Sequence, residues 1–335
     1  MTSGDRIRGA FVGLAIGDAA GWPAQRHRSG LHAPWSRRLR RELDEFAEKH
    51  ALTALPVPFA LNQPVGPLAT GPSDDAEWLA WTAATIGRDR AEAFGELAGR
   101  TDLRVRISVR SALDGLAAGR RPPVTGHDNP HFFDDSAAVR AVAFGAAGLD
   151  PRADAEVTNA GDGVLAALAV AAAVGTAVRG GDAEQVAAAA LAELPAYTAI
   201  GTAARIALDV ARAAGDPFSA VPELDAALLD HVYSYGVAAA RTVPVALALT
   251  VASGGRLGAA VPAAACLPDL ADSAPALTGA LTGAIGGYAA LPAAWAGAAR
   301  TLAGCCLPDL AGTDLLALAD DLRRPANDAK SRGEA

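Results

Sequence analysis

Two adjacent carboxylates, Asp74 and Asp75, stand where a turn containing glycine and proline gives way to an apolar run. Asp74 and Glu77 are three residues apart, the spacing of a capping box, so one interpretation is that they cap a helix that begins here. The other interpretation is a metal site, because hard divalent cations such as magnesium prefer carboxylate and hydroxyl oxygens, and Ser73 supplies a hydroxyl. The local sequence on its own favours the cap.

A second acidic stretch, near the other end of the chain, favours the metal site instead. Asp272 and Ser273 follow Asp269 and again stand directly before an apolar run. One metal ion often takes oxygen ligands from remote parts of a chain. If the starts of the two helices face each other, their oxygens would form a cage around such an ion.

Two further polar segments also come directly before apolar runs. Asp134, Asp135 and Ser136 precede one of them, and Thr158 with Asn159 precedes another. A helix cap or a turn explains each segment when it is taken alone. If all four helix starts converge, however, they would line a single polar cleft.

The composition of the chain narrows the class of protein. The 335 residues are 51% hydrophobic, enough for a sizeable core. The formal net charge of −8 and the pI near 5.3 argue against nucleic acid as the main partner, because binding phosphates calls for a basic face. The three cysteines, Cys266, Cys305 and Cys306, form neither a disulfide framework nor a zinc-ligand spacing. Such a composition suits the reducing cytoplasm, where we expect the protein.

The elements that hold these polar groups are predicted to be helices. Alanine dominates the apolar stretches, few residues alternate with period two, and glycine or proline separates one stretch from the next. We expect an all-α domain over residues 1–322, a long irregular region within it at 22–72, and a polar flexible tail at 323–335. The helical stretches are predicted at about 6–20, 75–99, 104–118, 137–148, 155–179, 183–194, 197–214, 222–252, 255–266, 274–288, 292–304 and 313–322.

One uncharged run, 277–299, is long enough to raise the question of a membrane span. Its Gly279 and Gly283 have the spacing at which small residues let membrane helices pack closely. The run is also rich in alanine and interrupted by Pro292, which is typical of close helix packing inside a globular core. We therefore expect no membrane association.

Six short motifs follow one another along residues 6–322, and each is weak alone. Taken in this order and spacing, they resemble the ADP-ribosylglycohydrolase family, which includes the dinitrogen reductase-activating glycohydrolases. The motifs are Gly17-Asp18-Ala19-Ala20-Gly21, Ser73-Asp74-Asp75-Ala76, Ser136-Ala137-Ala138-Val139-Arg140, Thr158-Asn159, Thr242-Val243-Pro244 and Ala290-Leu291-Pro292.

The resemblance implies a fold, a reaction and a set of site residues. The fold is an all-α orthogonal helical bundle, in agreement with the periodicity. The reaction is hydrolysis of the N- or O-glycosidic bond at the anomeric carbon of ADP-ribose, with one or two magnesium ions as cofactor. Carried over to this chain, the catalytic residues are Asp74 and Asp75, the metal ligands are Ser73, Asp74, Asp75, Asp272 and Ser273, and the substrate-binding residues are Asp18, Gln25, Asp135, Ser136 and Asn159.

Four departures from the family pattern leave three hypotheses open. Leu270 stands where the family has a metal-binding aspartate, Gln25 where it has an acid, Asn159 where it has a histidine, and Asp134-Asp135 where it has glycine and asparagine. The chain is a hydrolase of an ADP-ribosyl or related ribosyl substrate, an enzyme diverged to another nucleoside-like or cationic small molecule, or a pseudoenzyme that serves as a binding module. The expected partner is a small molecule or an ADP-ribosylated protein. The sequence does not give the oligomeric state, and a monomer is the default.

Overall fold

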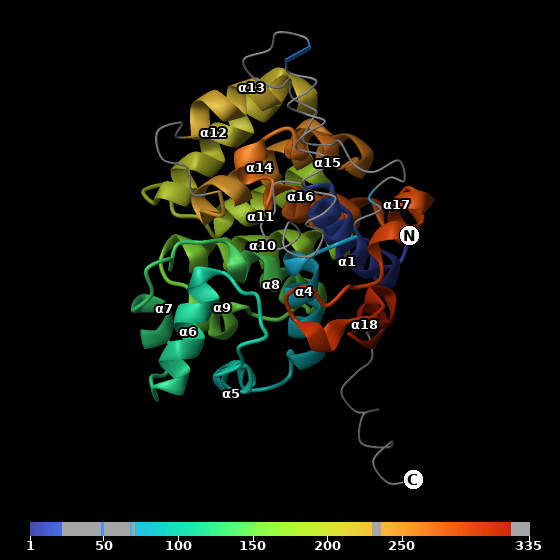
Figure 1. The fold of residues 1–335 in the computed structure, drawn as a ribbon. Helices are drawn as coiled ribbons and strands as arrows, with labels where there is room; N and C mark the ends of the chain where they lie inside the picture. The colour runs from blue at the N-terminus through green and yellow to red at the C-terminus, as the bar shows by residue number, and fades with distance from the viewer. Residues whose placement is uncertain (22–47, 50–67, 69–70, 230–235, 323–335) are drawn as a thin grey trace.

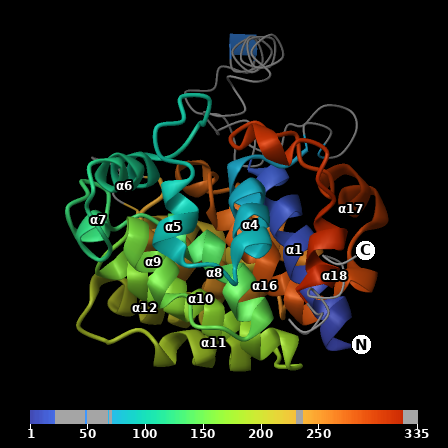
Figure 2. The ribbon, with the colours of Figure 1, turned by 90° about the horizontal axis from the view of Figure 1, so that it is seen from below.

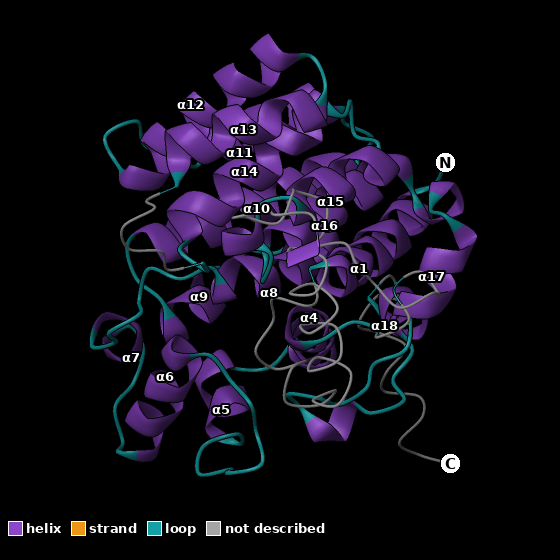
Figure 3. Cartoon of the chain, turned by 45° about the horizontal axis from the view of Figure 1, so that its top comes forward, coloured by secondary structure: helices purple, strands orange, loops and turns teal. Residues whose placement is uncertain are grey.

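The computed structural model describes residues 1–21, 48–49, 68, 71–229 and 236–322, and helices dominate this part of the chain (Figures 1 and 3). Within these ranges there is no strand, and only two isolated bridges join extended residues. The all-α prediction is confirmed. The α-helices are α1 (Ser3–Ala20), α4 (Asp74–Thr85), α5 (Arg90–Gly95), α6 (Ile107–Ala117), α7 (Val124–His127), α8 (Ser136–Ala147), α9 (Arg152–Thr158), α10 (Asp162–Val178), α11 (Ala183–Ala192), α12 (Ala199–Ala214), α13 (Pro217–Leu228), α14 (Ala239–Ala252), α15 (Leu257–Ala265), α16 (Ala274–Gly286), α17 (Ala293–Ala299) and α18 (Leu315–Asp321).

The first helix, α1, lies against α16 along its length, although the two are far apart in the sequence (Figures 1 and 2). Glycines on both helices let the backbones meet. A Cβ atom built on Gly13 would lie 2.2 Å from the carbonyl oxygen of Gly279, and one built on Gly9 would lie 2.1 Å from that of Gly283. The small residues of 277–299 therefore serve packing within the bundle, as expected.

The rest of the core follows from the alanine content of the helices. Helices α8 and α10 pack on each other, and α12 packs on α14, through buried faces rich in alanine. Short side chains allow such close approach at ordinary interior density. A separate aromatic cluster joins α4 to α5, where Trp78, Trp81 and Phe94 are in ring contact.

Several predicted helices are shorter than the sequence indicated. The stretch 75–99 is two helices, because the Asp89 side chain accepts a hydrogen bond from the Glu92 N–H and starts α5. The stretch 155–179 is also divided, at Gly161, whose φ of 52° is outside the helical range. The stretch 222–252 contains the second half of α13 and the whole of α14.

Two other predictions concern parts of the chain with few described residues. Most of the irregular region 22–72 and all of the tail 323–335 lie outside the described residues.

The run 277–299 divides into α16, a 3-10 turn and α17. None of the helices in the described ranges is both long and apolar enough to cross a membrane.

Candidate active site

The start of α4 is held by Asp18, from the C-terminal end of α1. The Asp18 carboxylate accepts hydrogen bonds from the Ser73 backbone N–H at 2.7 Å, the Ser73 hydroxyl at 2.5 Å and the Ala76 N–H at 3.0 Å. Asp18, a remote residue, thus accepts the N–H of Ser73 just before α4 and that of Ala76 in its first turn. The interpretation of Asp74 and Glu77 as a capping box is wrong. The carboxylate that caps α4 is that of Asp18, and Asp74 is the first residue of α4 rather than the residue before it.

Glu77, the other half of that supposed box, anchors a distant loop instead. Its carboxylate accepts backbone N–H groups from Cys305, Cys306 and Leu307 at 2.7 to 2.8 Å. Glu77 and the two cysteines are also close enough together to hold a metal ion. The two carboxylate oxygens already have three donors, however, so we assign Glu77 a structural role.

The centre of the candidate site is a side chain that the sequence motifs did not single out. Arg106, in the extended residue before α6, is 8% exposed and reaches into the space between the predicted metal ligands. Its Nη2 donates to Asp75 Oδ1 and to Ser273 Oγ, both at 2.7 Å. A guanidinium has five N–H donors in a planar fork, which suits it to joining several oxygens at once.

Three more carboxylates complete the surroundings of Arg106. Asp272 Oδ2 lies 3.3 Å from Nη2, Asp74 Oδ2 lies 3.4 Å from Nε, and Asp135 Oδ1 accepts from Nη1. These carboxylates come from the α4 start, the α8 start and the segment before α16. We call Asp74, Asp75, Arg106, Asp135, Asp272 and Ser273 the acidic cluster.

The acidic cluster has more negative than positive groups, and nearly all of it is buried. Asp74, Asp75 and Asp135 are each at most 1% exposed, and only the Asp272 side chain, at 27%, reaches solvent. Burial raises the pKa of Asp75 well above its ordinary range and raises that of Asp135 to about 7, although Arg106 opposes both shifts. Within the described part of the chain, Asp75 Oδ2 and Asp135 Oδ2 are buried without a hydrogen-bond partner, although the nearby Thr242 side chain acts to lower the pKa of Asp135.

A hydrogen-bonded network beside the acidic cluster holds the loop that carries Asp135. Asn159 donates to Asp134 Oδ1 at 2.9 Å and accepts from the hydroxyls of Ser136 at 3.0 Å and Thr158 at 2.6 Å. The polar start of α8 is therefore tied to the C-terminal end of α9. Asn159 replaces the family histidine as a connector that uses both its amide nitrogen and its oxygen.

Behind this network lies a buried ion triad, and of its members only Arg140 stands in one of the six sequence motifs. Asp154 accepts from Arg90 Nε at 2.9 Å and from Arg140 Nε at 2.7 Å, and Arg140 also donates to Thr158 Oγ1 at 2.7 Å. The two guanidinium groups lie over the rings of the aromatic cluster, which adds cation–π attraction. The triad thus connects the aromatic cluster to the loop of Asn159.

The predicted site residues are brought together only in part. The starts of α4, α8 and α16 meet at Arg106, and Ser136 and Asn159 lie in the adjoining network. Leu270, by contrast, is fully buried in an apolar cluster, and the Asp269 side chain is exposed. Gln25 lies outside the described residues.

Magnesium, which the family resemblance implies, does not fit this arrangement of side chains. The oxygens of Asp75 and Ser273 that would bridge the two segments are both hydrogen-bonded to Arg106 Nη2. The Ser73 hydroxyl donates to Asp18. An ion between the two segments would have to displace a guanidinium that carries charge of the same sign, so the magnesium site stays a prediction.

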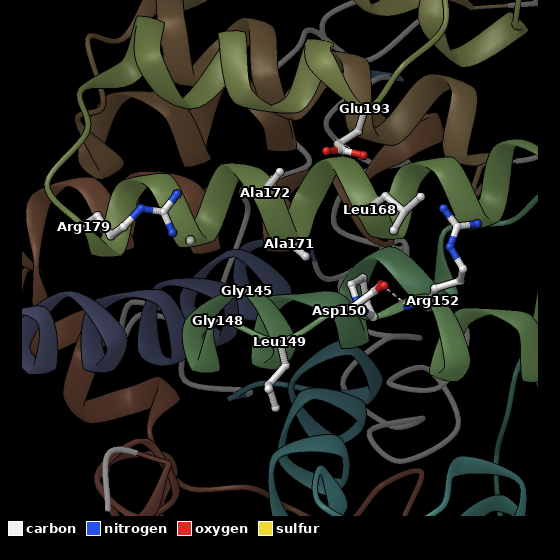
Figure 4. Close-up of a pocket in the computed structure, with 12 residues that line it drawn as sticks. Gly145, Gly148, Leu149, Asp150, Arg152, Leu168, Ala171, Ala172, Arg179 and Glu193 are labelled. Atoms are coloured by element: carbon white, nitrogen blue, oxygen red, sulfur yellow. Dashed lines mark hydrogen bonds between the residues drawn. The ribbon is translucent and has the colours of Figure 1, made fainter. Parts of the chain in front are cut away.

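A cavity of about 340 Å³ lies elsewhere, over α8 and α10 (Figure 4). Its floor is formed by small residues such as Ala171 and Ala172, and Arg152 and Arg179 stand at its two ends with Glu193 above (Figure 4). All three of these charged side chains are exposed. This cavity shares no residue with the acidic cluster.

The proteins that this chain resembles have the same kind of fold. The family model for ADP-ribosylglycohydrolase matches residues 1–331. A search of curated protein sequences finds no significant match. One similar solved structure is that of an ADP-ribosylglycohydrolase-related protein complex, with a TM-score of 0.60 and 19% sequence identity over 96% of this chain and 97% of that one. At this identity, the likeness concerns the fold alone.

Proposed function

The chain belongs to the ADP-ribosylglycohydrolase family, and we propose that it hydrolyses the glycosidic bond of an ADP-ribosyl or related ribosyl substrate at the acidic cluster. Membership of the family supports a glycohydrolase-like function. The substrate, a small molecule or an ADP-ribosylated protein, is part of the proposal, as are the catalytic residues. A cytoplasmic location and a monomeric state also stay predictions.

The observation that carries the proposal is that Asp75 Oδ2 and Asp135 Oδ2 are buried and, among the residues that the structure describes, have no hydrogen-bond partner. Burying a carboxylate without full hydrogen bonding costs free energy, and apolar residues would pack the same space without that cost. Hydrolysis of a glycosidic bond needs one group to protonate the leaving atom and another to take a proton from water. Asp75 and Asp135 present oxygens that can do both.

Arg106 gives these two carboxylates fixed positions. It binds Asp75 through Nη2 and Asp135 through Nη1, so one oxygen of each is held while the other remains for a substrate hydroxyl or a water. The rigid guanidinium plane sets the relative positions of the two groups. Asp272, as the partly exposed member, is the one that an arriving substrate meets first.

The alternative of a pseudoenzyme is favoured by one specific observation. Arg106 already partners four carboxylates, which a scaffold without catalysis would also need to keep them buried. It also gives Asp135 an internal cation, so a cationic substrate is not needed to explain that residue. A binding module would bind ADP-ribose without releasing any product, which separates it from a hydrolase.

The proposal is tested by incubating the purified chain with ADP-ribosylated peptides that carry N- or O-linked ADP-ribose and following released ADP-ribose by mass spectrometry. We expect release by the wild type and a loss of about 100-fold or more in Asp75→Asn and in Asp135→Asn. Asp128→Asn is the matched control, because Asp128 is exposed and pairs with Arg120 on the surface. Release at an equal rate in all variants would place the reaction elsewhere.

If the folded wild type releases nothing, calorimetric titration with ADP-ribose decides between the remaining hypotheses. Binding without hydrolysis would support the binding module. No binding would mean that the acidic cluster recognises another ligand, and the proposed substrate class would be wrong.

A further inference from the structure

We propose that the Arg106 guanidinium takes the place of a divalent metal ion in this chain, so that the acidic cluster is a metal-independent site with a built-in cation. The inference concerns the same cluster as the proposed function, but it does not depend on whether a glycosidic bond is hydrolysed.

A single nitrogen atom of Arg106, Nη2, contacts both segments that resemble metal-binding motifs. Nη2 lies 2.7 Å from Asp75 Oδ1, 2.7 Å from Ser273 Oγ and 3.3 Å from Asp272 Oδ2. Asp75 belongs to the first segment that resembles a metal-binding motif, and Asp272 and Ser273 belong to the second. A cation that bridges the two segments is thus already present, as part of the protein.

The remaining nitrogens extend the same role to a third segment. Nη1 binds Asp135, in the loop where the family has glycine and asparagine, and Nε approaches Asp74. A bound ion gathers oxygens from remote segments and neutralises their charge. Arg106 does both here, and Asp135 gives it an anionic partner that the asparagine of the family pattern would not provide.

The residues around the acidic cluster are consistent with the loss of an ion. Leu270, at the position of a family ligand, is 0% exposed and packs in an apolar cluster, so it adds no oxygen. The Ser73 hydroxyl is 2.5 Å from Asp18 and completes the capping of α4. The loss of one ligand and the commitment of another would weaken a metal site, whereas neither change affects Arg106.

Arg106 is also held where it is by the backbone around it. Its carbonyl oxygen accepts the Arg110 N–H at 2.9 Å as the first bond of α6, and Leu103 and Val109 on either side are buried. The guanidinium is withdrawn from solvent with its side chain 6% exposed. Removing it would leave several carboxylates buried without a counter-charge, which is strongly unfavourable.

The test is a titration of the full-length chain, freed of metals by a chelator, with Mn²⁺ as the probe and the free ion followed by electron paramagnetic resonance. We expect no stoichiometric binding to the wild type. The variant Arg106→Gln should bind Mn²⁺ at least about tenfold more tightly, because the carboxylates then lack a cation. Arg104→Gln is the matched control, since Arg104 is exposed two residues away and its loss should leave binding as in the wild type.

Each result of this titration decides the question. Stoichiometric, tight Mn²⁺ binding by the wild type would overturn the inference, since it would mean that the ion displaces Arg106. A folded Arg106→Gln variant with no gain in affinity would overturn it as well. If this variant does not fold, the wild-type titration still decides. Because the readout is metal binding, failure here is distinct from failure to hydrolyse ADP-ribosylated peptides.

Discussion

Replacing Gly279 by alanine tests the contact on which the placement of the candidate site depends. Gly279 lies on α16, whose N-terminal end follows Asp272 and Ser273, and it faces α1, which ends close to Asp18. A Cβ atom at this position would lie 2.0 Å from the carbonyl oxygen of Gly13 and 2.8 Å from its carbon. Ordinary contacts of a Cβ atom begin near 3.4 Å.

The size of the effect follows from these distances. The atoms that the methyl group meets belong to the backbone of another helix, so the clash cannot be relieved by turning a side chain. The helices would have to separate by about 1 Å or distort, and overpacking of this kind typically costs about 1–3 kcal/mol and sometimes more. Alanine gains about 1 kcal/mol of helix propensity over glycine. We expect a net loss of about 1–2 kcal/mol in the free energy of unfolding.

The measurement is urea unfolding followed by circular dichroism, with Gly297→Ala as the matched control. Gly297 is an exposed glycine inside α17, and no heavy atom lies within 4 Å of the point that an added Cβ atom would occupy. The same substitution there should stabilise the protein by up to about 1 kcal/mol. If both variants shift stability in the same direction, the close contact between α1 and α16 is refuted.

Two further predictions concern single carboxylates. Glu77→Gln should lower the free energy of unfolding, measured by urea unfolding, by about 2–4 kcal/mol. The reason is that an amide nitrogen would face the backbone N–H donors of residues 305–307. A loss below about 1 kcal/mol would contradict the anchoring role. Burial raises the pKa of Asp135 to about 7, above its value in the unfolded chain, so its contribution to stability is complete below about pH 4 and is lost as the pH rises through 7. Melting temperatures between about pH 4.5 and pH 8.5 should therefore fall less steeply in Asp135→Asn than in the wild type, and equal slopes would argue against this pKa.

The helical character of the chain could be predicted from sequence because it depends on local features. Alanine-rich runs, glycine and proline between them and the absence of period-two alternation are all read within short windows. The close packing around Gly279 and Gly283 was also expected, since small residues at that spacing permit backbone contact. The predicted positions of helix ends were less accurate where a single residue, such as Asp89 or Gly161, divides an apolar run.

The acidic helix starts, and their resemblance to a family, could also be recognised from the sequence. The contacts that each carboxylate makes could not be predicted from it. Capping by Asp74 was the economical local interpretation, yet Asp18, 55 residues before Ser73, supplies the oxygen. Asp18 was singled out for substrate binding, and nothing in its own neighbourhood indicated that it would cap another helix.

Arg106 shows most clearly the limit of the sequence. It stands among several arginines between residues 100 and 110, and no local pattern distinguishes it from those that remain exposed, such as Arg104. Its partner Ser273 is 167 residues away. The types of residue and their local periodicity determined the helices and the acids at their starts, because those depend on near neighbours. Only the tertiary structure decided which cation the acids share, because ion pairing depends on distances in space that the folding of the whole bundle creates.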